Sequence, residues 1–252
     1  MSGIMLRMQP VFKEKIWGGD HLKEFGYDLP SEKVGEYWAI SAHPHGVSTI
    51  ANGEFKGQKL DQLYASHREL FGDSKKEVFP LLTKILDAND WLSVQVHPDD
   101  EYGQKHEGEL GKTECWYILE AEENSTLVCG IKDGHNKESL AEVIEKGEIE
   151  KHLEKISVKP GDMIYIPSGT VHAIECGLKL IEVQQSSDVT YRMYDWGRDR
   201  EMHIEKSLQV IDYEGKNKGG KIENFTKLET PYFTVEKIDV KNVYSDTVHE
   251  QD

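Results

Sequence analysis

Short apolar runs, separated by glycine, proline, asparagine and aspartate, recur along most of the chain. Runs of this length that contain many β-branched and aromatic residues are typical of β-strands. A Lys-Pro-Gly-Asp sequence at 159–162 has proline and glycine where a β-turn favours them. The pattern predicts a mainly β chain, folded as an antiparallel sandwich or barrel. We expect its strands at 36–41, 79–87, 91–97, 114–119, 127–129, 163–166, 171–174, 178–184 and 233–240.

Two stretches have the apolar spacing of helices. Between 58 and 71, apolar residues recur at intervals of three and four positions, and the pattern stops at Gly72. Between 138 and 153, Ser139 precedes an apolar face as a helix cap would, and Gly147 ends the first part of the pattern. Because the second stretch lies between two groups of strands, we expect helical insertions into a β-fold.

Composition and charge narrow the class of protein. The chain has 252 residues, of which 37% are hydrophobic, so it can bury a substantial core. Its formal net charge of −16 disfavours binding to nucleic acid or to an anionic membrane. Neither a bilayer-spanning apolar run nor a secretory signal at 1–10 is recognisable. Three cysteines outside any CxxC pattern favour a reducing compartment, so we expect a cytoplasmic protein.

Two predicted strands carry polar side chains on one face. With a period of two, Gln95 and His97 share a face in the strand at 91–97, and Glu114 shares one with Lys112 and Trp116 in the next. A strand with one face in solvent has the same pattern. A carboxylate beside a large tryptophan, near a face that offers histidine and glutamine, also suits metal ligation. These strands alone leave both interpretations open.

The most informative segment is 161–172. It contains Gly161, five residues, Pro-Ser-Gly at 167–169, two further residues and His172. The glycine completes a turn, an apolar strand follows, and the Pro-Ser-Gly sequence turns the chain sharply before His172 begins the next strand. This spacing resembles the second sequence motif of the cupin superfamily, in which the histidine is a metal ligand inside a small β-barrel.

The candidate ligands form a recognisable donor set. His97, Glu114 and His172 offer two imidazoles and a carboxylate, and Gln95 is a candidate for a fourth, oxygen ligand. This set suits Zn²⁺ with one position open to water or substrate. It equally suits non-haem Fe²⁺ held by two histidines and one carboxylate. The residues themselves do not decide between the two metals.

Six short motifs carry a resemblance to a known family. They are Trp-Gly-Gly at 17–19, Gln-Val-His-Pro-Asp-Asp at 95–100, Gly-Lys-Thr-Glu at 111–114, Pro-Ser-Gly-Thr-Val-His at 167–172, Ser-Asp-Val-Thr-Tyr-Arg at 187–192 and Asp-Trp-Gly-Arg at 195–198. In this order they resemble the type I mannose-6-phosphate isomerases, particularly the short bacterial form. The resemblance extends from about residue 10 to about residue 240.

The resemblance implies a cupin-type fold and a specific reaction. This reaction is the zinc-dependent, reversible isomerisation of mannose 6-phosphate and fructose 6-phosphate through an enediolate intermediate. The family's single zinc ion per chain would be held by Gln95, His97, Glu114 and His172, or, as in many short forms, by the last three alone. Its active-site arginine and lysine fall on Arg192 and Lys112, which we expect to be catalytic. The oligomeric state and the general base are not indicated.

The charge of the implied substrate is an independent reason to expect Arg192 in the substrate site. A phosphate dianion is attracted to this acidic chain only by nearby cations, and the best supply is Lys112, Arg192, Arg198 and Arg200. We expect Lys112, Arg192 and Arg198 to bind the small sugar phosphate. In the alternative interpretation, the arginines form ion pairs with neighbouring acidic residues on a surface loop.

The resemblance also implies domain boundaries. Residues 1–230 would form a cupin-like catalytic region with helical insertions near 58–71 and 138–153, and 231–252 would begin a C-terminal β-region that is shorter than in the family. Two other functions remain compatible with the donor set. One is an iron-dependent cupin dioxygenase, and the other is a cupin that binds sugar phosphates without turnover.

Overall fold

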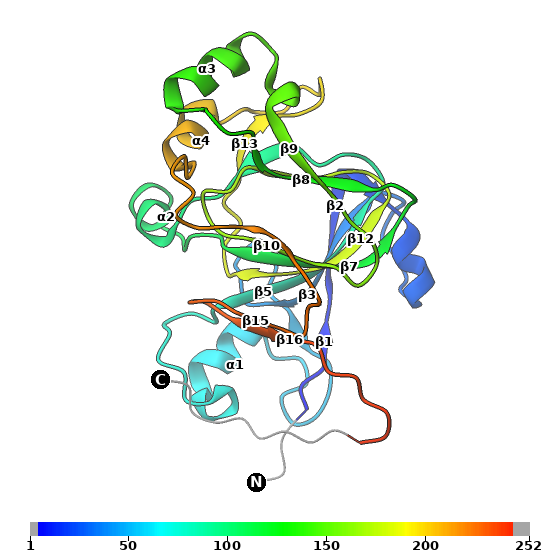
Figure 1. The fold of residues 1–252 in the computed structure, drawn as a ribbon. Helices are drawn as coiled ribbons and strands as arrows, with labels where there is room; N and C mark the ends of the chain where they lie inside the picture. The colour runs from blue at the N-terminus through cyan, green and yellow to red at the C-terminus, as the bar shows by residue number, and fades with distance from the viewer. Residues whose placement is uncertain (1–4, 244–252) are drawn as a thin grey trace.

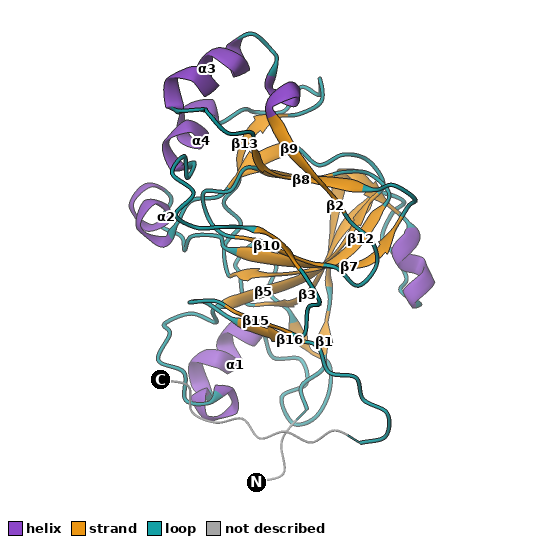
Figure 2. Cartoon of the chain, in the orientation of Figure 1, coloured by secondary structure: helices purple, strands orange, loops and turns teal. Residues whose placement is uncertain are grey.

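Two antiparallel sheets pack face to face in the body of the molecule (Figures 1 and 2). In the computed structural model, which describes residues 5–243, the larger sheet has the order β14 (Gly220–Ile222), β10 (Met163–Ile166), β7 (Glu114–Ala121), β12 (Leu178–Gln185), β5 (Leu81–Ala88), β3 (Val34–Ser41) and β2 (Val11–Gly19). The smaller sheet has the order β13 (Tyr191–Tyr194), β6 (Val94–Val96), β11 (His172–Ile174), β8 (Thr126–Ile131) and β9 (Leu153–Ser157). Two short pairs complete the described β-structure, β1 (Met8–Gln9) with β4 (Thr49–Ile50) and β15 (Lys227–Glu229) with β16 (Thr234–Glu236).

The sheets form a sandwich. Within residues 5–243 they share no strand, so they do not close into a barrel. The mainly β architecture predicted from the spacing of apolar runs is confirmed, and of the two predicted forms the structure has the sandwich.

Side chains of the smaller sheet alternate between two packing layers. Val94 of β6 points outward, where it packs in one cluster with Leu140 and Leu208 of the covering helices. Ile174 of β11 points inward and packs in the core between the sheets, together with Trp116 of the larger sheet. Burying a large apolar side chain contributes about 1.5–3 kcal/mol, so these two layers fix which face of each strand points inward.

The helices lie outside the sandwich. They are α1 (Leu60–Ser66), α2 (Asp100–His106), α3 (Lys137–Glu145) and α4 (Ile204–Val210), with short 3₁₀ turns η1 (His21–Phe25), η2 (Arg68–Phe71) and η3 (Ile149–His152). α1 with η2, and α3 with η3, occupy the two stretches where the apolar spacing predicts helix. The cap of α3 is Asn136, not Ser139. Its side chain accepts a hydrogen bond from the Ser139 N–H (2.9 Å), and the Ser139 hydroxyl accepts one from the Asn136 N–H (3.0 Å).

The predicted strand at 91–97 is shorter than expected and is reduced to β6. At its start the Asp90 carboxylate accepts a hydrogen bond from the Trp91 N–H (2.7 Å), and only the Leu92 N–H continues the pairing, to the Ile174 carbonyl (2.9 Å). Leu92 packs between the sheets, whereas strict alternation places it outward. At the other end, Pro98 has no N–H with which to continue the pairing.

The last described residues pack on the outer face of the larger sheet. Phe233, just before β16, joins a cluster with Cys115 of β7. The predicted strand at 233–240 is reduced to β16, since Val240 is already exposed and has no partner strand within residues 5–243. The part of the expected 231–252 region that follows residue 243 lies outside the described residues.

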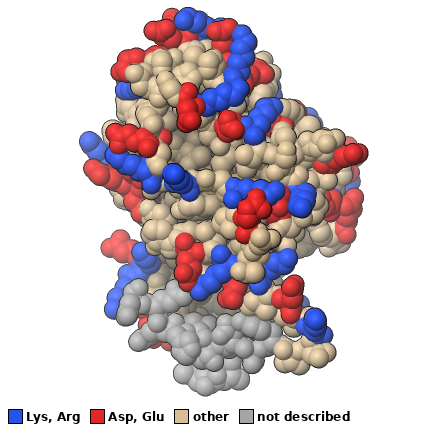
Figure 3. Space-filling view, in the orientation of Figure 1, with Lys and Arg blue, Asp and Glu red and all other residues tan. Residues whose placement is uncertain are grey.

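The surface mixes charges of both signs. On the face drawn in Figure 3, acidic and basic side chains are interspersed, so the net charge of −16 does not form one continuous acidic area there. None of the helices in the described part of the chain is long and apolar enough to cross a membrane.

Gly111 allows a close backbone approach just before β7. A Cβ at this position would lie 2.4 Å from the carbonyl carbon of Asp99 and 2.5 Å from the nitrogen of Asp100. The Asp100 carboxylate also accepts a hydrogen bond from the Gly111 N–H (2.8 Å). Because Lys112 is the next residue, this contact fixes the start of the segment that carries the predicted site residues Lys112 and Glu114.

We expect Gly111→Ala to lower the free energy of unfolding by about 2 kcal/mol, or about 4–8 °C in Tm, because the contacted atoms are backbone. The control is Gly53→Ala, where φ is +67° and nothing lies within 4 Å. That variant measures the cost of a left-handed backbone alone, about 1 kcal/mol. Thermal unfolding of both variants checks the prediction, and an equal loss in the two would contradict it.

Candidate metal site and adjoining cavity

Three side chains form a row across the inner face of the smaller sheet. In the strand register, His172 of β11 lies opposite Gln95 of β6, and Gln95 lies opposite Arg192 of β13. Directly opposed residues of antiparallel strands point to the same face. The Nε2 atoms of Gln95 and His172 are 3.2 Å apart. Since neighbouring strands lie about 4.8 Å apart, the backbone of Arg192 is roughly 10 Å from that of His172.

His97 and Glu114 reach the same place from the ends of two strands. His97 directly follows β6, and Glu114 is the first residue of β7. The His97 carbonyl accepts a hydrogen bond from the Gly169 N–H (2.9 Å), and the Pro98 carbonyl accepts one from the Lys112 N–H (3.0 Å). These backbone contacts hold the three motif segments together.

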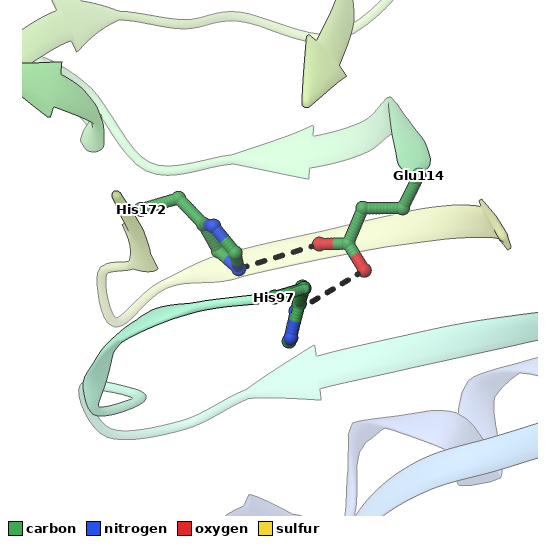
Figure 4. Close-up of side chains that lie close together, drawn as sticks. All are labelled: His97, Glu114 and His172. Atoms are coloured by element: carbon green, nitrogen blue, oxygen red, sulfur yellow. Dashed lines mark ion pairs between the residues drawn. The ribbon is translucent and has the colours of Figure 1, made fainter. Parts of the chain in front are cut away.

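His97, Glu114 and His172 converge in one buried cluster (Figure 4). The Nε2 of His97 lies 3.6 Å from Oε2 of Glu114, and the Nε2 of His172 lies 3.5 Å from Oε1. One ligand atom from each residue lies within 4.8 Å of the others, and no side chain of the three is more than 1% exposed. Residues 5–243 contain no second group of His, Cys, Asp or Glu with this geometry.

Burial sets the protonation of this cluster. It lowers the pKa of His172 to about 4 and the pKa of His97 well below its usual value, so both rings are neutral near pH 7. Burial, with the charge of Glu182, raises the pKa of Glu114 to about 7. The Glu114 carboxylate is paired with the Lys112 ammonium through Oε2, whereas Oε1 has no hydrogen-bond partner in the described part of the chain. Neutral imidazoles and a carboxylate with one unpaired oxygen are donors suited to a divalent cation.

Neighbouring groups orient these donors. The Nδ1 of His172 lies 2.8 Å from the Thr170 carbonyl, to which it donates, so Nε2 is left to face the cluster. The ammonium of Lys112 lies 2.8 Å from Oε2 of Glu114 and 2.9 Å from Nε2 of His97. Lys112 therefore supplies positive charge at the cluster, and it also lines the neighbouring cavity described below.

A second polar row crosses the inner face of the larger sheet. The register places Trp116 of β7, Glu182 of β12, Lys84 of β5 and Trp38 of β3 in successive opposition. The Glu182 carboxylate accepts a hydrogen bond from the Trp116 indole (3.1 Å) and forms an ion pair with Lys84 (2.8 Å). Both charged residues are only 3% exposed, so each needs the opposite charge of the other to offset the cost of burying its own charge.

Gln95 and Arg192 of the first row, with Lys84 and Glu182 of the second, line a cavity of about 300 Å³. This volume lies at the lower end of the range for small-molecule sites. Of the predicted site residues, Gln95, Lys112 and Arg192 line the cavity. Arg200 lines it as well, whereas Arg198 is not among its lining residues.

The arginines differ in their partners. Arg198 and Arg200 both form ion pairs with Asp195, as the surface-loop interpretation predicts for them. Arg192 forms no ion pair in the described part of the chain, and its Nη1 donates a hydrogen bond to the Glu201 carbonyl (2.6 Å). Burial and the nearby charge of Arg200 lower the pKa of Arg192. Arg192 is therefore the guanidinium with most capacity left for a ligand.

Comparison with known proteins agrees with this geometry. The family model for the catalytic domain of type I phosphomannose isomerase matches residues 5–127. A mannose-6-phosphate isomerase of Streptococcus mutans is 54% identical over 247 residues, which cover 92% of this chain and 78% of the relative. The chain belongs to the type I phosphomannose isomerase family. The resemblance stated from the motifs is thus confirmed, and the chain is an enzyme of the aldose–ketose isomerase class.

Solved structures confirm the cupin-type fold of this family member. The mannose 6-phosphate isomerase from Bacillus subtilis superposes with a TM-score of 0.81 at 44% identity, covering 91% of this chain and 74% of that one. A structure described as mannose 6-phosphate isomerase in its zinc-bound holo form has a TM-score of 0.64 at 17% identity, covering 83% and 74%. At that identity the second match shows the fold alone.

Sequence reasoning missed the charged row of the larger sheet. Lys84 stands between Leu82 and Leu86 on the inward face of β5, and Glu182 follows Leu180 on the inward face of β12. The sequence could have shown this, because in each strand a charged residue takes a position of the same face, two residues away from a buried leucine. This position indicates a charge that faces a core and therefore a paired or functional group.

Glu36 extends this row to the edge of the cavity. Its carboxylate lies 3.0 Å from the Lys15 ammonium and accepts a hydrogen bond from the Trp38 indole (2.6 Å). Burial opposes ionisation, but the charges of Lys84 and Lys15 outweigh it and lower the pKa of Glu36 to about 2. The ionised carboxylate is thus stabilised by folding.

We expect Glu36→Gln to destabilise the protein at pH 7 by roughly 1.5–3 kcal/mol, since it removes the buried carboxylate that pairs with Lys15 and adds negative charge beside Lys84. Because the folded pKa lies below the unfolded value, this contribution is complete above about pH 5 and disappears as the pH falls through 2. Urea unfolding of both proteins at pH 7 and pH 3 measures it. The exposed Glu14→Gln on β2 is the control, and an equal difference at both pH values would refute the assignment.

Proposed function

We propose that this chain interconverts mannose 6-phosphate and fructose 6-phosphate with one zinc ion bound by His97, Glu114 and His172. The observation that carries the proposal is the buried convergence of these three donors beside a cavity lined by cations. The names of its relatives support the reaction, and the zinc-bound state of one solved family member supports the metal.

The donor set fits zinc. Two neutral imidazoles and a carboxylate whose Oε1 has no hydrogen-bond partner would leave a fourth, open position, as in catalytic zinc sites. The side chain of Gln95 lies next to His172 and is the candidate for a further ligand. When bound, zinc would order the substrate oxygens and stabilise negative charge on them.

The reaction removes a proton beside a carbonyl and returns one to the neighbouring carbon. Removal of the proton leaves a single negative charge, which the two neighbouring oxygens of the enediolate share. Arg192 would stabilise that charge, because its planar donors face the cavity one strand away from Gln95. Lys112 would contact the same oxygens or assist proton transfer, since it lies between the cavity and the metal donors.

We expect metal analysis of the purified protein to find about one zinc per chain, with turnover lost on chelation and recovered on adding Zn²⁺. Glu114→Gln should weaken zinc binding by at least about 100-fold, since a ligating group is lost. Glu120→Gln, which changes an exposed carboxylate on the same strand, should bind zinc normally. Full turnover in zinc-free protein, or bound iron with consumption of O₂, would refute the proposal.

We expect Arg192→Lys to lower kcat by about 10²–10³-fold with little change in KM, because the interaction strengthens as charge develops. Zinc content should stay at the wild-type level. Steady-state kinetics in a coupled assay give both constants. Arg7→Lys, at an exposed position away from the cavity, is the control. Wild-type kinetics for Arg192→Lys would show that the assignment is wrong.

A further inference from the structure

The segment that follows β13 folds back over Arg192. His203 closes it, because the His203 N–H donates to the Arg192 carbonyl (2.8 Å) and His203 Nδ1 accepts from the Arg192 N–H (3.2 Å). Near the end of the segment, the Glu201 carbonyl accepts a hydrogen bond from Nη1 of Arg192 (2.6 Å). We call residues 195–203 the arginine loop, since it carries Arg198 and Arg200 and contacts Arg192.

Asp195 holds the arginine loop together from inside. The residue is 3% exposed, and its carboxylate accepts two hydrogen bonds from Arg200, at 2.7 Å (Nε to Oδ2) and 2.6 Å (Nη2 to Oδ1). Arg198 reaches the same carboxylate at 2.9 Å. Two-pronged arginine–carboxylate contacts fix the plane and direction of the guanidinium. The position of Arg200 therefore depends on Asp195.

The two arginines point to different places. Arg198 also donates to Asp90 (3.3 Å) and to the Trp91 carbonyl, and it does not line the cavity. Arg200 lines the cavity, and its Nη1 makes no hydrogen bond within residues 5–243. Asp195 thus occupies one edge of the Arg200 guanidinium and leaves the other edge for a ligand.

The unpaired donor groups of the cavity lie at this end. Lys15 is paired with Glu36, Lys84 with Glu182 and Lys112 with Glu114, and the Asp188 carboxylate also lines the cavity, near Lys84. Beside the arginine loop, Arg192 has no carboxylate partner in the described chain, and its buried Nε lacks a hydrogen-bond partner. Arg192, Arg198 and Arg200 carry three positive charges here, and Asp195 and Asp90 supply two negative ones. One positive charge is left, which a bound anion would neutralise.

We propose that Arg200, held in place by Asp195, binds the phosphate group of the substrate, and that Asp195 is a positioning residue. The proposal rests on the proposed function, which supplies a sugar phosphate as substrate. The reacting carbons and the phosphate lie at opposite ends of that molecule. The metal donors and the arginine loop likewise lie at opposite ends of the row formed by His172, Gln95 and Arg192.

The first test separates binding from chemistry. Asp195→Asn and Arg200→Gln should each raise KM about 10- to 100-fold, the worth of a charged hydrogen bond, and change kcat by no more than about threefold. If Asp195 acts through Arg200, the double variant should be no worse than Arg200→Gln alone. A purely structural role of Asp195 would instead lower kcat and Tm and add to the effect of Arg200→Gln.

Asp199→Asn is the matched control. It changes the same chemical group in the same loop, but Asp199 is exposed and has no partner in the described structure. Its KM should equal that of the wild type. An unchanged KM in Arg200→Gln would overturn the proposal, and this variant remains informative if Asp195→Asn fails to fold.

A second measurement does not require turnover. Calorimetric titration of zinc-loaded protein with inorganic phosphate should show binding that weakens about 10- to 100-fold in Arg200→Gln and in Asp195→Asn. Absence of phosphate binding to the wild type, or equal binding to all variants, would overturn the assignment. If the wild type binds phosphate in this way but catalyses no isomerisation, the proposed function fails while the anion site stands.

Discussion

The interior of this sandwich must hold several charged side chains, and each of them needs a partner there. A lone charge in such a place costs several kcal/mol, so the register of the strands has to bring opposite charges together. Lys84 and Glu182 meet in this way because β5 and β12 pair with those residues in opposition. The pairing is incomplete at Oε1 of Glu114 and at Arg192. The positions proposed for metal and substrate are those where the fold leaves buried charges without a full set of partners.

The parts of the fold that depend on local sequence could be predicted. The strand at 163–166 has the bounds of β10, because a Pro-Gly turn precedes it and a proline follows it. The alternation that placed Gln95 and His97 on one face is equally local. The burial of Lys84 and of Asp195 was missed for a different reason. Whether a charged residue faces a core depends on what packs over the strand or loop, and that is decided by residues distant in sequence.

The site is built on two kinds of support. The candidate metal donors lie on strands or directly beside them, where the ladder hydrogen bonds of both sheets restrict movement. The arginines depend on a loop that one buried carboxylate holds together. Metal ligation tolerates little displacement, whereas a phosphate can be gripped through several of its oxygens. Rigid strands and an anchored loop match these two requirements.

The acidity of the whole chain does not oppose an anionic substrate as strongly as its net charge of −16 implies. At physiological ionic strength, exposed charges are largely screened beyond about 8 Å. Inside the cavity the screening is weaker, and a phosphate bound as proposed would lie beside Arg192 and Arg200, although Glu36, Glu182 and Asp188 also line the cavity. Burial that lowers the pKa of Arg192 also means that its charge is poorly solvated before a ligand arrives. An anion that pairs with Arg192 would relieve this cost, so unsatisfied guanidinium groups, rather than the net charge of the lining, favour an anion here.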